Sequence, residues 1–263
     1  MRCQLAAIRC RKGDVAGNLA GHLRLVAKAA AAGCQLAVFP EMSLTGSVHP
    51  TGAERLIALD HPAIARLAEV SGETGVGVCF GIAERGPGGQ PHITQVVAVS
   101  GRIAGVQRKR HLGEGEEAFT AAAESAVFEH AGTRFGIAIC AEAGFDAPFD
   151  AAAAAGARLV LFPAAPGLHG RRDSEASWRR GFSWWEQSSL GDARRHAQRL
   201  RLWIALAGQA GATADEDFPG LAALVDPEGK VTARLPDWHP GVLTAEIPAE
   251  AGTGSRRPSS AAG

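Results

Sequence analysis

The sequence predicts an α/β fold, in which helices cover the faces of β-sheets. Short apolar runs rich in Val, Ile and Leu recur along the 263-residue chain, and Gly, Pro or charged residues bound them. Such runs are typical of largely buried strands. Several of them are separated by stretches in which apolar residues recur at helical spacing. Strands and helices that alternate in this way indicate sheets covered by helices.

The predicted strands are QLAAI near the N-terminus, 35–39, 75–83, 93–100, 102–107, 133–140, 157–162 and 202–208. Helices are predicted for 15–32, 60–74 and 192–201. Asp14 can cap the first helix through its carboxylate, and Gly33 can end it. Pro62 suits the first turn of the second helix, because a helix needs no N–H donor there.

Two stretches, 75–108 and 220–247, contain successive strands without helices between them, so the sheets should include antiparallel pairs. The sequence DPEG at 226–229 favours a hairpin turn. We find no linker, repeat or domain boundary, and we therefore expect one domain over residues 1–248. The remaining residues, 249–263, are small, polar and rich in Gly and Ser, and are predicted to be disordered.

Composition argues against several classes of protein. Basic and acidic side chains balance at 27 each, so no overall field attracts nucleic acid or an anionic membrane. The start of the chain shows no signal-peptide pattern, and no apolar run is long enough to cross a bilayer. Five widely spread cysteines without a CxxC pair argue against a disulfide framework and a zinc site. We expect a cytoplasmic protein without a metal or membrane partner.

Three chemically useful side chains follow predicted strands. Glu41 comes after QLAVF and a proline, Lys109 after RIAGVQR, and Cys140 ends TRFGIAIC. Taken singly, each has a plain explanation, as a solvated loop residue or a buried core cysteine. In α/β sheets, however, functional groups gather beyond the carboxyl ends of strands. Together these residues supply a nucleophile, a candidate base and a candidate cation.

The sequence resembles the nitrilase superfamily, the carbon–nitrogen hydrolases, in three signature regions. FPEMSLTG (39–46), RKRHL (108–112) and GIAICAEAGF (136–145) occur in the family's order and at suitable spacings. The resemblance continues through the following strands and helix to about residue 248. It implies a four-layer α-β-β-α sandwich with mixed sheets. It also implies assembly into a homodimer or larger homo-oligomer.

The resemblance implies an amidase-like hydrolase that acts on a small amide and uses no cofactor. Glu41 matches the family's general base, Lys109 its catalytic lysine, and Cys140 the nucleophile that forms a thioester. A second catalytic glutamate is expected within GEGEEAF (113–119), which offers Glu114, Glu116 and Glu117, with Glu117 as the first candidate and Glu116 as the second. Burial raises the pKa of a glutamate and a nearby lysine lowers it, so the basicity of Glu41 depends on their balance.

The substrate is less well defined than the reaction. The candidate substrate-binding residues are Ala141, Glu142 and His111, and Ala141 stands where the family commonly has an aromatic or polar residue. Nitrile hydrolysis, N-carbamoyl hydrolysis and acyl transfer remain open. So does a catalytically silent binding or scaffold protein. A cysteine hydrolase with His111 as its base is a rival mechanism.

The segment 167–189 is rich in Trp and Arg, which favour contact surfaces. The resemblance places it near the mouth of the active site and a subunit interface. The alternative is a solvated helix whose tryptophans point inward. Arginines at this place would favour a substrate that carries a carboxylate.

Overall fold

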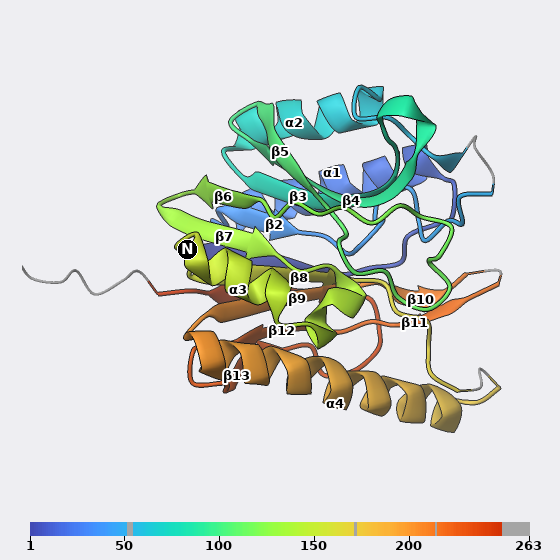
Figure 1. Ribbon diagram of the computed structural model, residues 1–263, viewed down its shortest axis with the longest axis vertical. Helices are drawn as coiled ribbons and strands as arrows, with labels where there is room; N and C mark the ends of the chain where they lie inside the picture. Colours follow the sequence, from blue (N-terminus) through green and yellow to red (C-terminus); the bar gives the residue numbers. More distant parts are fainter. Residues whose placement is uncertain (52–54, 171–172, 214, 249–263) are drawn as a thin grey trace, which may run out of the picture.

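The computed structural model describes residues 1–51, 55–170, 173–213 and 215–248. Two six-stranded sheets face each other, and a pair of helices covers the outer face of each (Figure 1). This arrangement confirms the predicted four-layer α-β-β-α sandwich. The predicted disordered segment, 249–263, lies outside the described residues.

The first sheet has the strand order β14-β1-β2-β3-β4-β5. Its strands are β1 (Arg2–Ala7), β2 (Leu36–Val38), β3 (Gly77–Arg85), β4 (Pro91–Val99), β5 (Arg102–Arg108) and β14 (Gly241–Glu246). The neighbours β1, β2 and β3 are parallel, and the other pairs are antiparallel. The helices α1 (Val15–Ala31) and α2 (Pro62–Thr74) connect the parallel strands, which need such crossovers.

The second sheet has the strand order β13-β12-β9-β8-β7-β6. Its strands are β6 (Val127–His130), β7 (Thr133–Ile137), β8 (Leu159–Ala164), β9 (Trp203–Gly208), β12 (Ala222–Val225) and β13 (Val231–Arg234). The helices α3 (Ala147–Ala154) and α4 (Glu175–Leu200) cover its outer face. A small hairpin of β10 (Ala210–Ala212) and β11 (Asp217–Pro219), and the short 3-10 helices η2 (Pro87–Gly89) and η3 (Cys140–Gly144), complete the described elements.

The core has three apolar layers, and strand β8 shows how the sequence builds them. Leu159 and Leu161 point into the layer between the two sheets, whereas Val160 and Phe162 point toward the helices on the outside. Successive side chains of a strand face opposite ways, and both faces of this strand are covered. Every residue of β8 is therefore buried, which explains its unbroken apolar run.

The predicted helix and turn signals act as expected in three places. The Asp14 carboxylate accepts a hydrogen bond from the Gly17 backbone N–H at 2.9 Å and caps α1. Pro62 lies in the first turn of α2, which ends before Gly75 with its left-handed φ of 72°. The DPEG turn joins β12 to β13, and its Gly229 has a φ of 78°.

The third predicted helix begins much earlier than the sequence indicated. Ser174 caps α4 by accepting a hydrogen bond from the Ser177 N–H, so the helix starts at Glu175 rather than near 192. The Trp/Arg-rich segment is thus mostly helical, with Trp185 buried and Trp184 47% exposed. Strand β6, helix α3 and the β10–β11 hairpin were not predicted. Within the described parts of the chain, no helix combines the length and apolar character needed to cross a membrane.

Candidate active site

The three predicted catalytic residues meet at one edge of the sandwich. Glu41 follows β2 and Lys109 follows β5 in the first sheet, while Cys140 follows β7 in the second. The Lys109 Nζ lies 2.8 Å from Glu41 Oε1, and both side chains are almost completely buried. The other oxygen of Glu41 accepts a hydrogen bond from the Ala165 N–H at 2.9 Å, just after β8. Both sheets therefore contribute to the position of Glu41.

The loop that carries Glu41 is held against β3 by hydroxyl side chains. Ser43 Oγ accepts a hydrogen bond from the Gly81 N–H at 3.1 Å, and Thr45 Oγ1 accepts one from the Ala83 N–H at 2.9 Å. These buried N–H groups would otherwise lack an acceptor, which is costly inside a protein. The chain can thus leave regular strand geometry after β2 and still place Glu41 in the interior.

A second glutamate reaches the lysine, and it is Glu116 rather than Glu117. Glu116 Oε1 lies 2.6 Å from Lys109 Nζ, and its other oxygen accepts the Gly113 N–H at 2.6 Å. Glu117 is exposed and accepts a hydrogen bond from the Gly115 N–H at 3.0 Å. The turn over 113–116 directs residue 116 inward and residue 117 outward, so the contact with Lys109 is made by the candidate that the sequence ranked second.

The electrostatics of the cluster keep a proton on the thiol. Burial raises the pKa of Cys140 well above its usual value, the nearby Glu41 raises it further, and Lys109 lowers it. Burial also raises the pKa of Glu41, although Lys109 opposes this effect. Burial alone would lower the pKa of Lys109, but the charges of Glu41, Cys140 and Glu116 outweigh it and raise that pKa. The lysine is therefore a permanent cation.

Cys140 adopts a left-handed backbone conformation with a φ of 47°. This conformation is uncommon for any residue other than glycine, and it concentrates at functional sites. The turn into η3 begins at Cys140, so the side chain leaves the end of β7 and faces a cavity.

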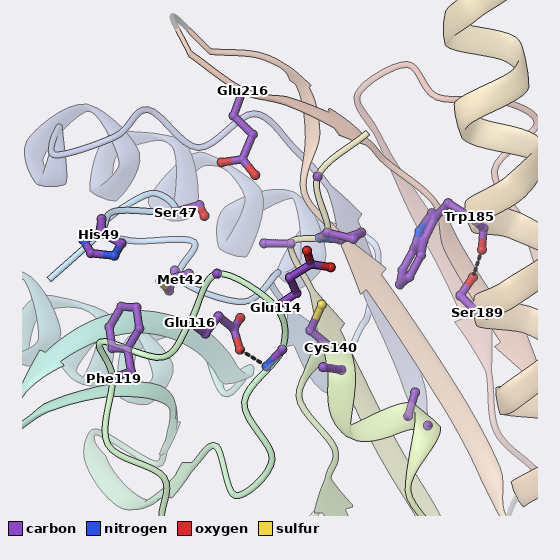
Figure 2. A pocket seen from close by; sticks show the side chains of 18 of the residues that line it. Met42, Ser47, His49, Glu114, Glu116, Phe119, Cys140, Trp185, Ser189 and Glu216 are labelled. Carbon is purple, nitrogen blue, oxygen red and sulfur yellow. Dashed lines mark hydrogen bonds between the residues drawn. The ribbon is translucent and has the colours of Figure 1, made fainter. Parts of the chain in front are cut away.

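The cavity has a volume of about 700 Å³. Figure 2 shows Cys140 between Trp185 on one side and Met42 and Phe119 on the other, with Glu216 at the rim. Trp185 belongs to the segment 167–189, which its composition singled out, Met42 follows Glu41 within FPEMSLTG, and Phe119 ends GEGEEAF. None of the three was predicted to line the substrate cavity.

The three candidate substrate-binding residues have different positions. Ala141 lines the cavity. Glu142 is completely buried and forms an ion pair with Arg110, at 2.8 Å between Oε2 and Nη2, so it does not face the cavity as predicted. The ring of His111 stacks on Phe145, with 4.2 Å between the ring centroids, and it does not line the cavity either.

The described arginines of segment 167–189 do not line the cavity, so they give no support to the predicted preference for a carboxylate, although Arg55 does line it. Lys12 lines the rim, but its Nζ lies 3.1 Å from Asp215 and 2.9 Å from Glu216, which neutralise it. Arg179 instead pairs with Glu175 at 2.9 Å, on the surface of α4. Residues 171–172, which the prediction also used, lie outside the described residues.

Comparisons with known proteins identify the family of the chain. The sequence matches the carbon-nitrogen hydrolase family over residues 3–257. A curated protein of Pseudomonas protegens, described as "Hydrolase in pqqF 5'region", is 32% identical over 173 residues. The match covers 63% of this chain and 59% of that protein, so the chain spans about three fifths of the length of this curated relative.

Solved structures of an amidase from Nesterenkonia AN1 share the fold. A cysteine-to-alanine mutant of this amidase from the nitrilase superfamily has a TM-score of 0.80 and 26% identity, covering 94% of this chain and 90% of that one. A glutamate-to-glutamine mutant, which shows Michael addition of acrylamide at the active-site cysteine, has a TM-score of 0.81 and 25% identity, covering 94% and 93%. A family match over nearly the whole chain, on a sandwich shared with these amidases, shows that the chain belongs to the carbon–nitrogen hydrolases as an amidase-like member of the nitrilase superfamily.

Proposed function

We propose that the protein hydrolyses the carbon–nitrogen bond of a small non-peptide amide through a thioester on Cys140. The observation that carries this proposal is the contact of Glu41 with Lys109 beside a cysteine that opens into a cavity. A binding protein has no need for a buried base, a buried cation and a nucleophile in one place. The match to an enzyme family and the likeness to amidases give further support.

The first step requires Glu41 to act as a general base. The raised pKa of Cys140 keeps its thiol neutral, and a thiol is a poor nucleophile until it loses its proton. Glu41 takes this proton as Sγ attacks the amide carbon. Its raised pKa makes it a stronger base than a glutamate in water, while Lys109 keeps a share of it ionised.

The attack turns the carbonyl oxygen into an oxyanion. The Lys109 ammonium and the backbone N–H of Ala141, directly after the nucleophile, are the proposed donors to this oxygen. Loss of one such donor typically costs about 2.7–4 kcal/mol of transition-state stabilisation. Glu116 contributes by holding the lysine, because its carboxylate is a second acceptor for Nζ beside that of Glu41.

The tetrahedral intermediate then collapses, and Glu41 returns its proton to the departing nitrogen, which leaves as ammonia or an amine. The acyl group stays on Cys140 as a thioester. Glu41 next removes a proton from water, the resulting hydroxide attacks the thioester, and the acid leaves as Sγ recovers a proton. One carboxylate thus serves as base in both halves of the reaction.

The proposal is tested by incubating the protein with amides, nitriles and N-carbamoyl amino acids and measuring ammonia and carbon dioxide. We expect turnover of amides, and an acyl adduct on Cys140 in the mass spectrum of substrate-treated protein. The variant Cys140→Ala should keep its fold and lose both. Cys79→Ala is the matched control, since Cys79 is buried in β3 away from the cavity. Robust turnover by Cys140→Ala, or an adduct on Cys79, would contradict the mechanism.

A further inference from the structure

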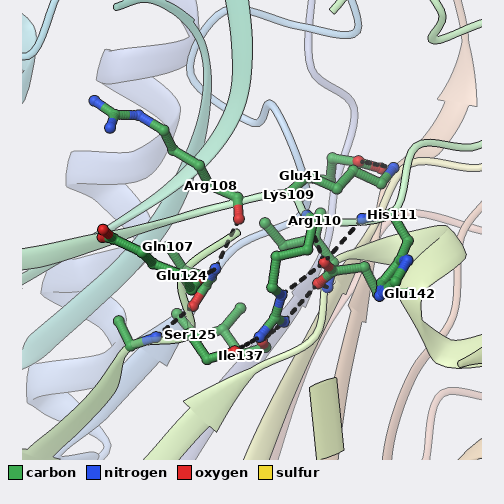
Figure 3. Close-up of polar contacts among 12 residues, drawn as sticks. Glu41, Gln107, Arg108, Lys109, Arg110, His111, Glu124, Ser125, Ile137 and Glu142 are labelled. Atoms are coloured by element: carbon green, nitrogen blue, oxygen red, sulfur yellow. Dashed lines mark hydrogen bonds and ion pairs between the residues drawn. The ribbon is translucent and has the colours of Figure 1, made fainter. Parts of the chain in front are cut away.

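A buried carboxylate joins the two strands that deliver Lys109 and Cys140. Glu142 Oε1 accepts the Arg110 backbone N–H at 2.7 Å and the Arg110 Nε–H at 2.9 Å. Its Oε2 accepts the Ile139 N–H at 2.8 Å and Arg110 Nη2 at 2.8 Å. Figure 3 shows the two side chains facing each other between the strands. The carboxylate thus binds the residue after the lysine and the residue before the cysteine.

The sheet topology explains why such a link matters. Lys109 follows β5, which is an edge strand of the first sheet, whereas Cys140 follows β7 of the second sheet. Hydrogen-bonded ladders fix positions within a sheet, and none joins β5 to β7. The separation of the lysine and the cysteine therefore depends on contacts that cross between the sheets.

The guanidinium of Arg110 extends this link. Its Nη2 also donates to the Ile137 carbonyl at 2.7 Å, at the end of β7, and its Nη1 donates to Ser125 Oγ at 2.5 Å. The planar fork of an arginine holds a carboxylate in a defined orientation, which a lysine cannot do. Burying two charges is by itself a poor source of stability, since removing them from water offsets much of their attraction. Fixed geometry is what this arrangement supplies.

We propose that Glu142 and Arg110 are positioning residues that set the separation of Lys109 and Cys140 across the two sheets. This inference rests on the proposed function, in which the lysine stabilises the oxyanion formed at the cysteine. A displacement of about 1 Å in such a site can lower the rate about a hundredfold. Neither residue needs to touch the substrate, and neither lines the cavity.

The chain offers a matched control on the other side of the same lysine. Glu84 is 1% exposed and accepts hydrogen bonds from Arg108 Nε at 2.7 Å and Nη2 at 2.6 Å. It also accepts the Thr94 hydroxyl at 2.6 Å. Glu84 and Arg108 are joined by two hydrogen bonds, as Glu142 and the Arg110 side chain are. However, Glu84, Thr94 and Arg108 lie on β3, β4 and β5, which all belong to the first sheet. This pair therefore does not set a distance between the sheets.

The test compares Glu142→Gln and Arg110→Lys with Glu84→Gln and Arg108→Lys. Glutamine keeps the volume and one acceptor, and lysine keeps the charge but loses the fork. The measurements are kcat and KM on an amide, per active site titrated with iodoacetamide, and the rate of Cys140 alkylation. We expect Glu142→Gln and Arg110→Lys each to lose about a hundredfold in kcat with little change in KM. Alkylation of Cys140 should also be slower in both. The control variants should lose stability but keep kcat and the alkylation rate.

Three outcomes would overturn the proposal. One is a folded Glu142→Gln protein with normal kcat, and another is an equal loss in the Glu142 and Glu84 variants. The third is a rise in KM without a fall in kcat, which would indicate a role in substrate binding. If Glu142→Gln does not fold, Arg110→Lys decides the question. A wild-type protein without amide turnover would contradict the proposed function instead. The alkylation rates of Cys140 would then still test whether Glu142 and Arg110 position the cysteine.

Discussion

Glu41 and Cys140 both hold a proton more tightly than the same side chains do in water, and burial is the main cause for each. Burial opposes the charged form of each residue, and Lys109 favours it. The Lys109 ammonium binds the carboxylates of Glu41 and Glu116, and its charge lowers the pKa values of Glu41 and Cys140 against the effect of burial. This balance supports the proposed role of Glu41 as a general base and argues against a preformed thiolate on Cys140.

The raised pKa of Glu41 predicts the acidic limb of the pH profile. The base must be ionised, so kcat/KM falls as the pH drops through the pKa of Glu41 in the free enzyme. Since this pKa lies above its usual value, the limb should lie above about pH 4.3, where an ordinary glutamate titrates. The carboxylate of Glu116 contributes to the upward shift. Glu116→Gln should therefore move the limb to lower pH, whereas the exposed Glu117→Gln should leave it in place.

The measurement is kcat/KM between pH 4 and 8, with far-UV circular dichroism at each pH to exclude unfolding. A limb at or below the ordinary glutamate value would show that the lysine outweighs burial. A shift with Glu117→Gln and none with Glu116→Gln would restore the order that the sequence favoured.

At the scale of elements, the sequence predicted strands better than it predicted turns and helix faces. Strands such as β8 are covered on both sides and therefore appear as continuous apolar runs. The meeting of Glu41, Lys109 and Cys140 was predictable because all three follow strands whose carboxyl ends lie at one edge of the sandwich. The choice between Glu116 and Glu117 was not, because a one-residue change in a turn exchanges inside and outside.

Which side chains of a helix point inward was equally hard to predict from the sequence. Trp184 and Trp185 are adjacent, yet one is 47% exposed and the other 7%, and only packing of α4 on the second sheet decides which. The second half of helix α3, after Asp150, is a run of alanines, so the helix lacks the apolar periodicity that marked the other helices. Met42 and Phe119 reach the cavity through loops, for which the sequence carries no periodic signal.

The approach of the Glu41 loop to β3 predicts a strict requirement for glycine at position 81. A Cβ at Gly81 would lie 2.1 Å from the Met42 backbone nitrogen and 2.8 Å from the Glu41 carbonyl carbon. Both atoms belong to the backbone, so the loop itself must move. We expect Gly81→Ala to destabilise the protein by about 1–3 kcal/mol, as overpacking does, and to lower kcat in the folded fraction.

Urea denaturation and kcat measure these effects. Gly191→Ala is the control, since a Cβ there meets no atom within 4 Å in the middle of α4. It should stabilise the protein by about 0.5–1 kcal/mol, because alanine favours a helix interior over glycine. Full activity and stability in Gly81→Ala would mean that the loop adjusts freely and that its contact with β3 does not position Glu41.

At the scale of the whole molecule, the candidate active site belongs to neither sheet alone. Glu41 and Lys109 come from the first sheet, and Cys140 comes from the second. One apolar layer between the sheets holds them together, with contributions from strands such as β1 and β8. The distances among Glu41, Lys109 and Cys140 are therefore maintained only if this layer stays intact.

This shared layer predicts that residues 1–248 unfold as one cooperative unit. Leu161 is completely buried between the sheets, so Leu161→Ala should lower the free energy of unfolding by about 2–5 kcal/mol. Val242→Ala, on an exposed position of β14, should change it by less than about 0.5 kcal/mol. Native-state hydrogen exchange can follow the amides of β2 and β8 separately. In a cooperative unit the loss at Leu161 lowers protection in both strands equally, because neither sheet keeps its inner face covered without the other. Loss of protection in β8 with β2 unaffected would instead divide the chain into two units, and the active site would then lie at an interface between domains.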